Sequence, residues 1–392
     1  MRLTRLSLKN FRNYSALNFE PCPGFNYISG LNGAGKTNLL EAIYFLIHLR
    51  SFRRIHRSRM VAEGSEGMHL RGEFTRHPGA AGPTLEATVQ GRERKYRADG
   101  KEATDLLAYL GRVHAVVFFP ESLQVMKGGP ALRRAFFDRA IAAEDPRHLA
   151  EAREYNRILL ERNRLLRGTG TANSDIITVW EQRLLKSAAR IIARRHQYLE
   201  SLRRHLSSLE QRLAPGLAGS MEVEYAAAAA GAGRGGERWA DLLGRPTPAG
   251  SLEGKAEDLL REAAERARSE EGRRGSTLWG PHLDDFRVLL GGRRAKETAS
   301  QGEQRLLTIA LVAATVESYR EARRDEPIVL LDDLSSELDE RRREDVLRYL
   351  GSMGAQVFIT STERPGARPA EAGCFSVEGG ILTACRSRGP QG

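Results

Sequence analysis

The sequence has 392 residues, 41% of them hydrophobic, and a formal net charge of +11. This length accommodates one or two ordinary cores, and the basic excess suits a polyanion such as DNA or RNA, although it would also serve solubility alone. Three cysteines without metal or disulfide spacing, and no run near the roughly 20 apolar residues of a membrane span, predict a cytoplasmic protein without a membrane partner.

Strand and helix patterns alternate over the first 120 residues. Apolar and polar residues alternate through 1–20, which predicts a strand pair, and residues 25–29 form a short apolar run typical of a buried strand. A 3.6-residue apolar period predicts a helix from Lys36 to His48. Antiparallel strands are expected over 69–101, with a hairpin turn at Asp99-Gly100, and a buried strand over 115–119.

The pattern then changes to mainly helical. Residues 121–210 are rich in Arg, Leu and Glu and favour a series of short helices, and 226–237 form a low-complexity stretch that predicts a flexible loop. A further helix is expected over 253–270. The apolar runs at 327–333 and 355–360 are typical of central parallel strands that are covered on both faces.

A phosphate-binding motif lies between the strand at 25–29 and the helix that follows it. Residues 30–37 read GLNGAGKT and match the pattern GxxxxGK[ST] in full. Backbone N–H groups of such a turn surround a phosphate, and the helix N-terminus adds partial positive charge. We expect Lys36 to contact the β- and γ-phosphates and Thr37 to ligate Mg²⁺. The predicted phosphate site comprises Gly30, Asn32, Gly33, Ala34, Gly35, Lys36 and Thr37.

Two adjacent carboxylates end the apolar strand at 327–333. Asp332 is placed to reach Mg²⁺ beside a phosphate loop, and Asp333 to orient or deprotonate an attacking water. A solvated turn is the alternative interpretation of two aspartates at a strand end. Together with the phosphate motif they predict hydrolysis of a nucleoside triphosphate, and these motifs alone do not distinguish ATP from GTP.

The segment Ser300-Gln-Gly-Glu-Gln-Arg305 precedes a strongly helical pattern. Ser300 and Glu303 fit a capping box, so a well-capped helix is one interpretation. The segment also resembles the signature of ABC-type ATPases, with Ser300, Gln301, Gly302 and Gln304 as its contact residues. Residues 335–339 resemble the D-loop of the same superfamily through Ser336, Glu337 and Asp339. The resemblance implies that two copies pair head-to-tail and bury two ATP molecules, each touching Lys36 of one copy and Ser300 of the other.

These motifs predict an α/β fold with an ABC-type ATPase head, built from a mixed sheet around the phosphate-loop core and an antiparallel N-terminal sheet, and interrupted by a helical insertion domain. We expect the N-terminal ATPase part, with the Walker A motif, over 1–120, and the mainly helical insertion over 121–274. The C-terminal ATPase part, with the signature, Walker B and D-loop motifs, is expected over 275–392.

Further blocks of sequence are similar to the RecF family along nearly the whole chain, except about 226–250. The phosphate loop and the signature are 270 residues apart, from 30 to 300, which is far longer than in transporter ATPases. The similar blocks are LKNFRNY (8–14), NGAGKTNLLEAIYFL (32–46), PESLQVMKGGPALRRAFFD (120–138), YNRILLERN (155–163) and WGPHLDD (279–285). Phe137 stands where the family usually has an aliphatic residue. Residues 360–362 read Thr-Ser-Thr and lack a switch histidine, which, with Asp333 in place of Glu, favours slow turnover.

The resemblance implies an ATP- and Mg²⁺-dependent protein of recombinational DNA repair. It implies an ATP-dependent homodimer that binds double-stranded DNA and single-strand/double-strand junctions next to gaps, with weak DNA-stimulated ATPase activity. It also implies work with RecO and RecR to load RecA, roles in SOS induction and replication maintenance, and a nucleoid-associated cytoplasmic location.

An arginine-rich segment directly after the phosphate-loop helix is the first candidate for DNA contact. Planar guanidinium groups suit phosphates, although a solvated charged loop is the alternative. The residues are Arg50, Arg53, Arg54, Arg57 and Arg59. Weaker candidates are Arg133, Arg134, Arg194 and Arg195 in the helical insertion. Because no helix-turn-helix or zinc module is present in the sequence, we expect backbone contacts with little sequence preference.

Three other classes of protein share part of these features. A transporter ATPase subunit would need a membrane partner, and the signature, the spacing and the missing histidine argue against it. A structural SMC-like protein needs heptads sustained over several repeats, which the expected short helices do not offer. A P-loop kinase or GTPase would lack the signature and D-loop.

Overall fold

The computed structural model describes residues 1–53, 55–77, 79–168, 174–213, 221–230, 234–244, 248–333, 340–363 and 372–385. The chain forms two compact units, one of Met1–Ser122 with Tyr319–Gly392 and one of Leu123–Ser318. The second unit therefore extends past residue 274, where the sequence analysis ends the insertion. The three domain ranges expected from the sequence stay a prediction.

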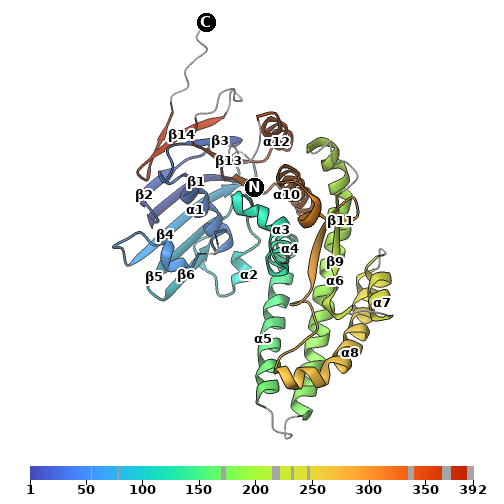
Figure 1. Ribbon diagram of the computed structural model, residues 1–392. Coiled ribbons are helices and arrows are strands. Elements are labelled where there is room, and N and C mark those ends of the chain that lie inside the picture. Colours follow the sequence, from blue (N-terminus) through green and yellow to red (C-terminus); the bar gives the residue numbers. More distant parts are fainter. Residues whose placement is uncertain are drawn as a thin grey trace. The chain divides into compact units, whose positions relative to one another are not determined.

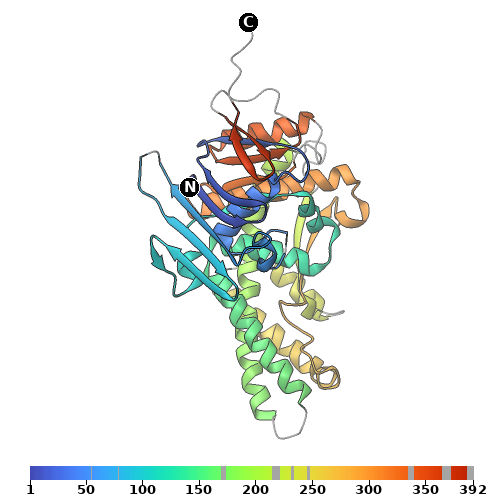
Figure 2. The ribbon, with the colours of Figure 1, turned by 90° about the vertical axis from the view of Figure 1, so that its left-hand side faces the viewer.

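The first unit contains an antiparallel sheet in the order β2-β1-β4-β5-β6-β7. Alternating apolar side chains of β1, such as Leu6 and Leu8, are buried, as expected for a half-buried strand. Figure 2 shows the strands of this sheet in blue and light blue. The strand pair at 1–20, the antiparallel strands over 69–101 and the turn at Asp99-Gly100 are confirmed. The strands are β1 (Arg2–Phe11), β2 (Tyr14–Phe19), β4 (Gly67–Thr75), β5 (Thr84–Gln90), β6 (Glu93–Ala98) and β7 (Lys101–Glu102).

A second sheet of the same unit has the order β15-β14-β3-β13-β12-β8. Strands β14, β3, β13, β12 and β8 run parallel to their neighbours, with β8 at the edge, and the apolar residues of the central β13 and β12 are buried. The four short strands expected from the sequence are confirmed. The strands are β3 (Phe25–Ser29), β8 (Ala115–Phe118), β12 (Ile328–Leu331), β13 (Val357–Ser361), β14 (Gly373–Glu378) and β15 (Ile381–Ala384).

Helix α1 (Lys36–His48) packs against strands of both sheets, including β4 and β13 (Figure 1). Its bounds agree with the prediction, because its apolar residues recur with the helical period and are all buried. Its N-terminus therefore lies at the carboxyl end of β3, where the phosphate motif begins. The other helices of this unit are η1 (Arg57–Met60), α2 (Leu106–Tyr109) and α12 (Glu340–Ser352).

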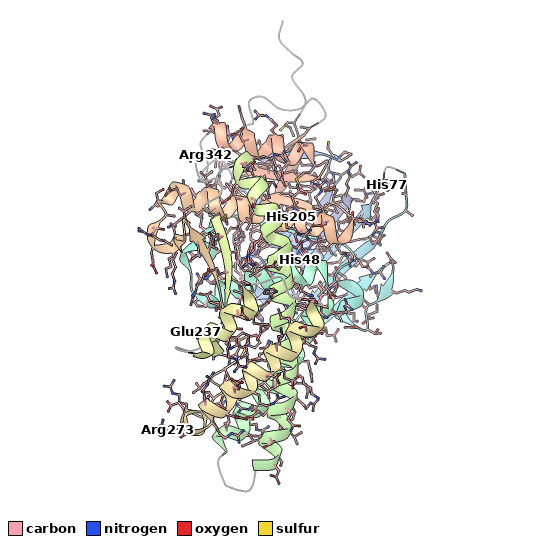
Figure 3. The ribbon with its side chains drawn as sticks, turned by 90° about the vertical axis from the view of Figure 1, so that its right-hand side faces the viewer. His48, His77, His205, Glu237, Arg273 and Arg342 are labelled. Carbon is pink, nitrogen blue, oxygen red and sulfur yellow. The ribbon has the colours of Figure 1, made fainter. Side chains whose placement is uncertain are left out.

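The second unit is mainly helical, and its long helices α5, α6 and α8 pack together. Figure 3 shows α8 lying along α6, with Arg273 near the C-terminal end of α8. A small sheet, β11-β10-β9, packs on this helical part through α4 and α6. The elements are α3 (Gln124–Lys127), α4 (Pro130–Glu144), α5 (Arg147–Arg167), α6 (Ser174–Leu213), β9 (Met221–Ala226), η5 (Ala228–Ala230), α7 (Arg234–Leu243), α8 (Ala249–Arg274), β10 (Asp285–Leu290), β11 (Arg293–Arg294) and α9 (Ala295–Thr298). The division between the two units falls within η2 (Pro120–Leu123) and within α10 (Gln301–Arg323).

Two expectations for this unit are wrong. The insertion does not consist of short helices only, because α6 alone spans 40 residues. Its buried face packs against both α5 and α8, so tertiary contacts extend it beyond the breaks that local composition suggests. The stretch 226–237 is not simply a loop, since α7 begins at Arg234 and buries Trp239. The helix expected over 253–270 is confirmed within α8.

No helix in the described part of the chain combines the length and the apolarity that crossing a membrane requires.

Candidate functional site

The glycine turn at 30–35 connects β3 to α1. Gly35 has φ +119°, and a Cβ there would lie 2.5 Å from the Asn13 side-chain nitrogen. A Cβ on Gly30 would collide with the backbone carbonyl of Val377. The motif therefore needs glycine at both positions, because the backbone approaches its neighbours too closely for a side chain. Asn32 and Gly33 are exposed at the top of this turn, and Ala34 is half-buried.

Lys36 begins α1 and its ammonium group lies over the glycine turn. Its Nζ donates hydrogen bonds to the carbonyl oxygens of Gly30, at 2.7 Å, and Leu31, at 3.0 Å. Burial lowers the pKa of Lys36, while the nearby carboxylates of Asp333 and Asp332 raise it. A cation is thus held at the mouth of the turn, within the electrostatic reach of both aspartates.

Asp332 and Asp333 follow β12, and a hydroxyl network holds the first of them. Asp332 Oδ1 accepts hydrogen bonds from Thr37 Oγ1, at 2.8 Å, and from Thr360 Oγ1, at 2.7 Å. The backbone N–H of Asp333 donates to Thr360 Oγ1 at 2.9 Å. Asp332 is 5% exposed, and burial raises its pKa, an effect that the two hydroxyl donors oppose. The parallel order of β3, β13 and β12 brings these residues together from positions about three hundred residues apart.

The donor set at this point fits Mg²⁺. A threonine hydroxyl and an aspartate carboxylate are hard oxygen ligands, which this ion prefers, and they lie within hydrogen-bonding distance of each other in the structure. The buried carboxylate has no ion pair among the described residues, so its charge is balanced only by hydroxyl donors and by the field of Lys36 and Arg53. Thr37 and Asp332 would hold the ion.

The turn between β1 and β2 supports the phosphate loop, and the sequence analysis did not assign it this role. Asn13 Nδ2 donates to the carbonyl oxygen of Ala34 at 2.9 Å, and Tyr14 Oη donates to that of Gly35 at 3.0 Å. Burial raises the pKa of Tyr14, so its hydroxyl stays a donor. Both residues lie in the block LKNFRNY. That block indicated them only through its resemblance to the RecF family, and not through any contact with the phosphate loop. Thr360 was likewise noted only for standing where a switch histidine is absent.

The signature segment caps helix α10. Ser300 N donates to Glu303 Oε2 at 2.7 Å, and Glu303 N donates to Ser300 Oγ at 3.3 Å, so the capping box is confirmed. The hydrogen bond from Ser300 lowers the pKa of Glu303. Gln301 is exposed and Gly302 half-buried at the helix start, and Gln304 is buried, with Nε2 donating to the Ala299 carbonyl at 2.8 Å. Ser300 belongs to the second unit and the phosphate loop to the first.

Some predicted site residues lie outside the part of the chain that the structure describes. These are the D-loop residues Ser336, Glu337 and Asp339, and Arg54 of the arginine-rich segment. Their roles stay predictions.

The remaining arginines of that segment fall into two groups. Arg50 and Arg59 are exposed, and no carboxylate among the described residues pairs with either. Arg57 is half-buried, and its Nη1 donates to Tyr96 Oη at 3.3 Å. Arg53 turns toward α1, where its Nη1 donates to Asn38 Oδ1 at 3.1 Å. Of the four described side chains, only Arg53 therefore makes a hydrogen bond to the phosphate-loop helix.

The weaker DNA candidates in the helical insertion stay predictions, and carboxylates or carbonyls of the same unit already engage their guanidinium groups. Arg195 is buried and forms a bidentate pair with Asp138, with both donor–acceptor distances 2.8 Å. The guanidinium of Arg133 pairs in the same way with Asp285 at 2.8 Å. Arg194 pairs with Asp145 and Glu151, and Arg134 donates to the Asp284 carbonyl. Taking these guanidinium groups to DNA would leave partly buried carboxylates unpaired.

Comparison with known proteins agrees with this arrangement. Residues 2–378 match the family described as RecF/RecN/SMC N terminal domain. A DNA replication and repair protein RecF of Myxococcus xanthus (strain DK1622) is 36% identical over 380 residues, which cover 95% of this chain and 93% of that protein. The chain belongs to the RecF family.

Solved structures extend the likeness of this RecF-family chain to its fold. A structure of the recombination mediator protein RecF with ATP, from the RecFOR pathway, is 28% identical with a TM-score of 0.85 and covers 98% of both chains. An SMC head bound to the C-terminal winged-helix domain of ScpA is 16% identical, with a TM-score of 0.52 over 98% of both chains. The fold is therefore that of an ABC-type ATPase head, as predicted from the sequence.

Proposed function

We propose that this chain is an ATP-dependent DNA-binding protein of recombinational repair and replication maintenance. One observation carries the proposal: Lys36, Thr37 and the Asp332–Asp333 pair meet at the end of the parallel strands, with Thr360 joining the two aspartates. Such a set serves a nucleoside triphosphate. The RecF structure with ATP supports ATP rather than GTP as that nucleotide.

The proposed division of roles follows from the chemistry of each group. The N–H groups of Asn32, Gly33, Ala34 and Gly35 surround the β-phosphate, and Lys36 stabilises the charge on the terminal phosphates. Thr37 and Asp332 hold Mg²⁺, which when bound neutralises phosphate charge. Asp333 orients or deprotonates the water. A carboxylate shorter by one methylene than glutamate, with no histidine beside it, supports weak hydrolysis.

A second copy of the chain completes the proposed site. Ser300 lies at the N-terminus of a 23-residue helix, where unsatisfied N–H groups and the helix dipole favour an anion. We place Ser300, Gln301, Gly302 and Gln304 of one copy against the terminal phosphate held by the other, with Ser336, Glu337 and Asp339 along the interface. ATP then joins two copies, and hydrolysis releases them.

DNA binding is assigned to the arginine-rich segment, which comprises residues 50–59. Its exposed cations face solvent directly after the phosphate-loop helix, and the dimer would bring two such segments to one duplex. The contacts are to backbone phosphates, so affinity falls steeply with salt. We propose preference for duplex DNA at single-strand/double-strand junctions beside gaps.

The biological setting is proposed from the family. The RecF structure that resembles this chain is described as part of the RecFOR pathway. We propose RecR, acting with RecO, as partner and RecA loading and SOS induction as outcomes, with DNA stimulating a weak ATPase. We propose a cytoplasmic, nucleoid-associated location.

Sedimentation of the purified chain tests the proposal. The wild type is run alone, with Mg²⁺-ATP, with a gapped duplex, and with both, beside Lys36→Ala and the control Lys9→Ala on the exposed side of β1. We expect ATP to convert wild type and Lys9→Ala to dimers that bind the gapped duplex, and Lys36→Ala to stay monomeric. Unaltered dimer formation by Lys36→Ala would count against the phosphate assignment, and ATP-independent DNA binding by the wild type would count against the function.

A further inference from the structure

A carboxylate buried in the phosphate-loop helix gathers two arginines from outside that helix. Glu41 is 0% exposed. Arg12 forms a bidentate pair with it, from Nε at 2.9 Å and from Nη2 at 3.0 Å, and Arg53 Nη1 lies 3.8 Å from the same group. Ser51 Oγ also donates to it. Because a buried carboxylate is costly unless it is paired, this cluster fixes the positions of its three partners relative to α1.

The partners of Glu41 hold both ends of the arginine-rich segment. At the first end, Ser51 Oγ accepts a hydrogen bond from Arg53 N at 3.0 Å. At the second end, Arg12 Nη1 donates to the Arg59 carbonyl at 2.8 Å, and Arg12 N donates to the Met60 carbonyl at 2.7 Å. The segment that carries the exposed arginines is thus fastened to α1 through one acidic side chain.

The same cluster connects to the phosphate loop. Arg53 Nη1 donates to Asn38 Oδ1 at 3.1 Å, and Asn38 Nδ2 donates to Asn13 Oδ1 at 2.8 Å. Asn13 in turn donates to the Ala34 carbonyl at 2.9 Å. A hydrogen-bonded path therefore runs from the backbone of the glycine turn, through two asparagines, to Arg53, whose guanidinium forms an ion pair with Glu41 at 3.8 Å.

We propose that Glu41 is a positioning residue that couples the nucleotide loop to the arginine-rich segment. Nucleotide that orders the glycine turn also orders Asn13 and Asn38, and through Arg53 and Glu41 it orders the segment. By linkage, a phosphate backbone bound to the segment favours the nucleotide-bound turn to the same extent. The part concerning DNA rests on the proposed function, whereas the coupling itself concerns only this chain and ATP.

Limited trypsin digestion of the full chain measures the coupling directly, because the segment consists largely of trypsin sites. Wild type, Glu41→Gln and the control Glu20→Gln are digested with and without Mg²⁺-ATP, and cleavage within 50–59 is followed by mass spectrometry. The control removes the carboxylate charge of the exposed Arg5–Glu20 pair. We expect ATP to slow cleavage of wild type and Glu20→Gln by about 5-fold or more. Glu41→Gln should be cleaved faster and lose this protection while still binding a fluorescent ATP analogue.

A second variant keeps the test decisive if Glu41→Gln does not fold. Asn38→Ala interrupts the path to Asn13 and leaves the buried charge cluster in place. We expect its segment to be cleaved without ATP at the wild-type rate but to gain no protection from ATP. Protection retained in either variant overturns the coupling.

DNA affinity measured in parallel separates this inference from the proposed function. If ATP does not change the DNA affinity of the wild type, the proposed function fails and the trypsin result still decides the coupling. If ATP raises the DNA affinity of the wild type and of Glu41→Gln by the same factor, the coupling fails and the proposed function stands.

Discussion

Each unit of the molecule carries a pair of adjacent aspartates, Asp332–Asp333 in the first and Asp284–Asp285 in the second, and their surroundings differ. In the second unit Asp285 faces Arg133, whose guanidinium donates two hydrogen bonds of 2.8 Å to it. Asp284 is buried beside further arginines and accepts a hydrogen bond from a backbone N–H at 2.7 Å. Asp285 is thus paired with a cation of its own unit and holds the small sheet to the helices, whereas the Asp284 carboxylate accepts hydrogen bonds from the Tyr225 hydroxyl and the Ala228 N–H, with the charges of Arg195 and Arg134 nearby.

In the first unit, Asp332 is buried but its direct hydrogen-bond donors are neutral hydroxyls, from Thr37 and Thr360. Its negative charge has no fixed cation in contact with it among the described residues, so it retains the capacity to attract one. The difference between Asp285 and Asp332 indicates that a carboxylate paired directly with arginine serves the fold, whereas one held by hydroxyls at the end of the parallel strands can still bind a cation.

Removing Arg133, which pairs with Asp285, should have the largest effect on stability. Arg133→Met leaves Asp285 partly buried without its partner, and we expect the chain to lose about 3–5 kcal/mol of stability. Urea unfolding followed by circular dichroism measures this. Arg261→Met is the control, because its pairs with Glu257 and Asp258 lie on the exposed face of α8 and should contribute at most about 0.5 kcal/mol. Equal losses of stability in Arg133→Met and Arg261→Met would show that the Arg133–Asp285 pair contributes no more than a pair on the surface.

The next effect concerns the pH dependence of stability in the second unit. Burial raises the pKa of Asp284 to about 6, so the folded state binds this proton more tightly than the unfolded state, and stability falls as pH rises from about 4 to 6. Burial lowers the pKa of His282 to about 4, so stability falls as pH drops from 6.5 to 4. The two slopes oppose each other. The groups around Asp284 are Arg134 on α4, Arg195 on α6, Tyr225 on β9 and the neighbouring Asp285.

Asp284→Asn should expose the slope of His282. Asn keeps an oxygen for the Ala228 N–H, which Asp284 accepts at 2.7 Å, but it does not titrate. Between pH 4 and 6.5 we expect the stability of the variant to rise with pH by roughly 3 kcal/mol more than that of the wild type, as about two pKa units imply. Urea unfolding at several pH values measures it. Parallel curves for the two proteins would show that Asp284 does not titrate in this window.

The third effect tests the two aspartates of the phosphate site. Asp333→Asn removes the group that orients or deprotonates water, and we expect ATP hydrolysis to slow by roughly 100-fold. Asp333 has φ 51°, a conformation that asparagine adopts as readily as aspartate, so stability and ATP-bound dimers should be kept. Asp285→Asn is the corresponding variant in the second unit. We expect it to keep the wild-type rate of ATP hydrolysis and to lose stability. Normal turnover by Asp333→Asn would assign the water to another group.

Patterns within short stretches of the sequence predicted those helices, strands and motifs that depend only on neighbouring residues. The helix from Lys36 to His48 and the short strands β3 and β12 follow from apolar spacing, and the Ser300–Glu303 capping box from a four-residue motif. The predicted phosphate-site residues carry a motif whose glycines are required sterically. Each of these features is encoded by residues that lie close together in the sequence, so the sequence was sufficient to predict it.

The rest depends on contacts between distant segments. Nothing near Arg133 indicates that Asp285 will pair with it, and the same holds for Arg195 and Asp138, so the density of arginine alone does not reveal which cations form ion pairs within the fold. The length of α6 is set by packing on α5 and α8 rather than by its own composition. Thr360 reaches Asp332 only because β13 lies beside β12.

The smallest expected effect concerns the arginines of the first unit that pair with no carboxylate among the described residues, in contrast to the paired arginines of the second unit. Replacing Arg50, Arg57 and Arg59 together by Gln removes up to three phosphate contacts without unpairing any carboxylate among the described residues. We expect DNA affinity to fall by about 10-fold and the slope of log affinity against log salt to decrease by roughly 2 to 3. Fluorescence anisotropy over a salt series measures both. Arg261→Gln is the control for charge, since it also removes exposed cationic charge, and its slope should stay near that of the wild type. An unchanged slope in the triple variant would place the DNA elsewhere on the chain. We expect the stability of the triple variant to stay within about 0.5 kcal/mol of the wild type, which would show that the loss of DNA affinity does not come from unfolding.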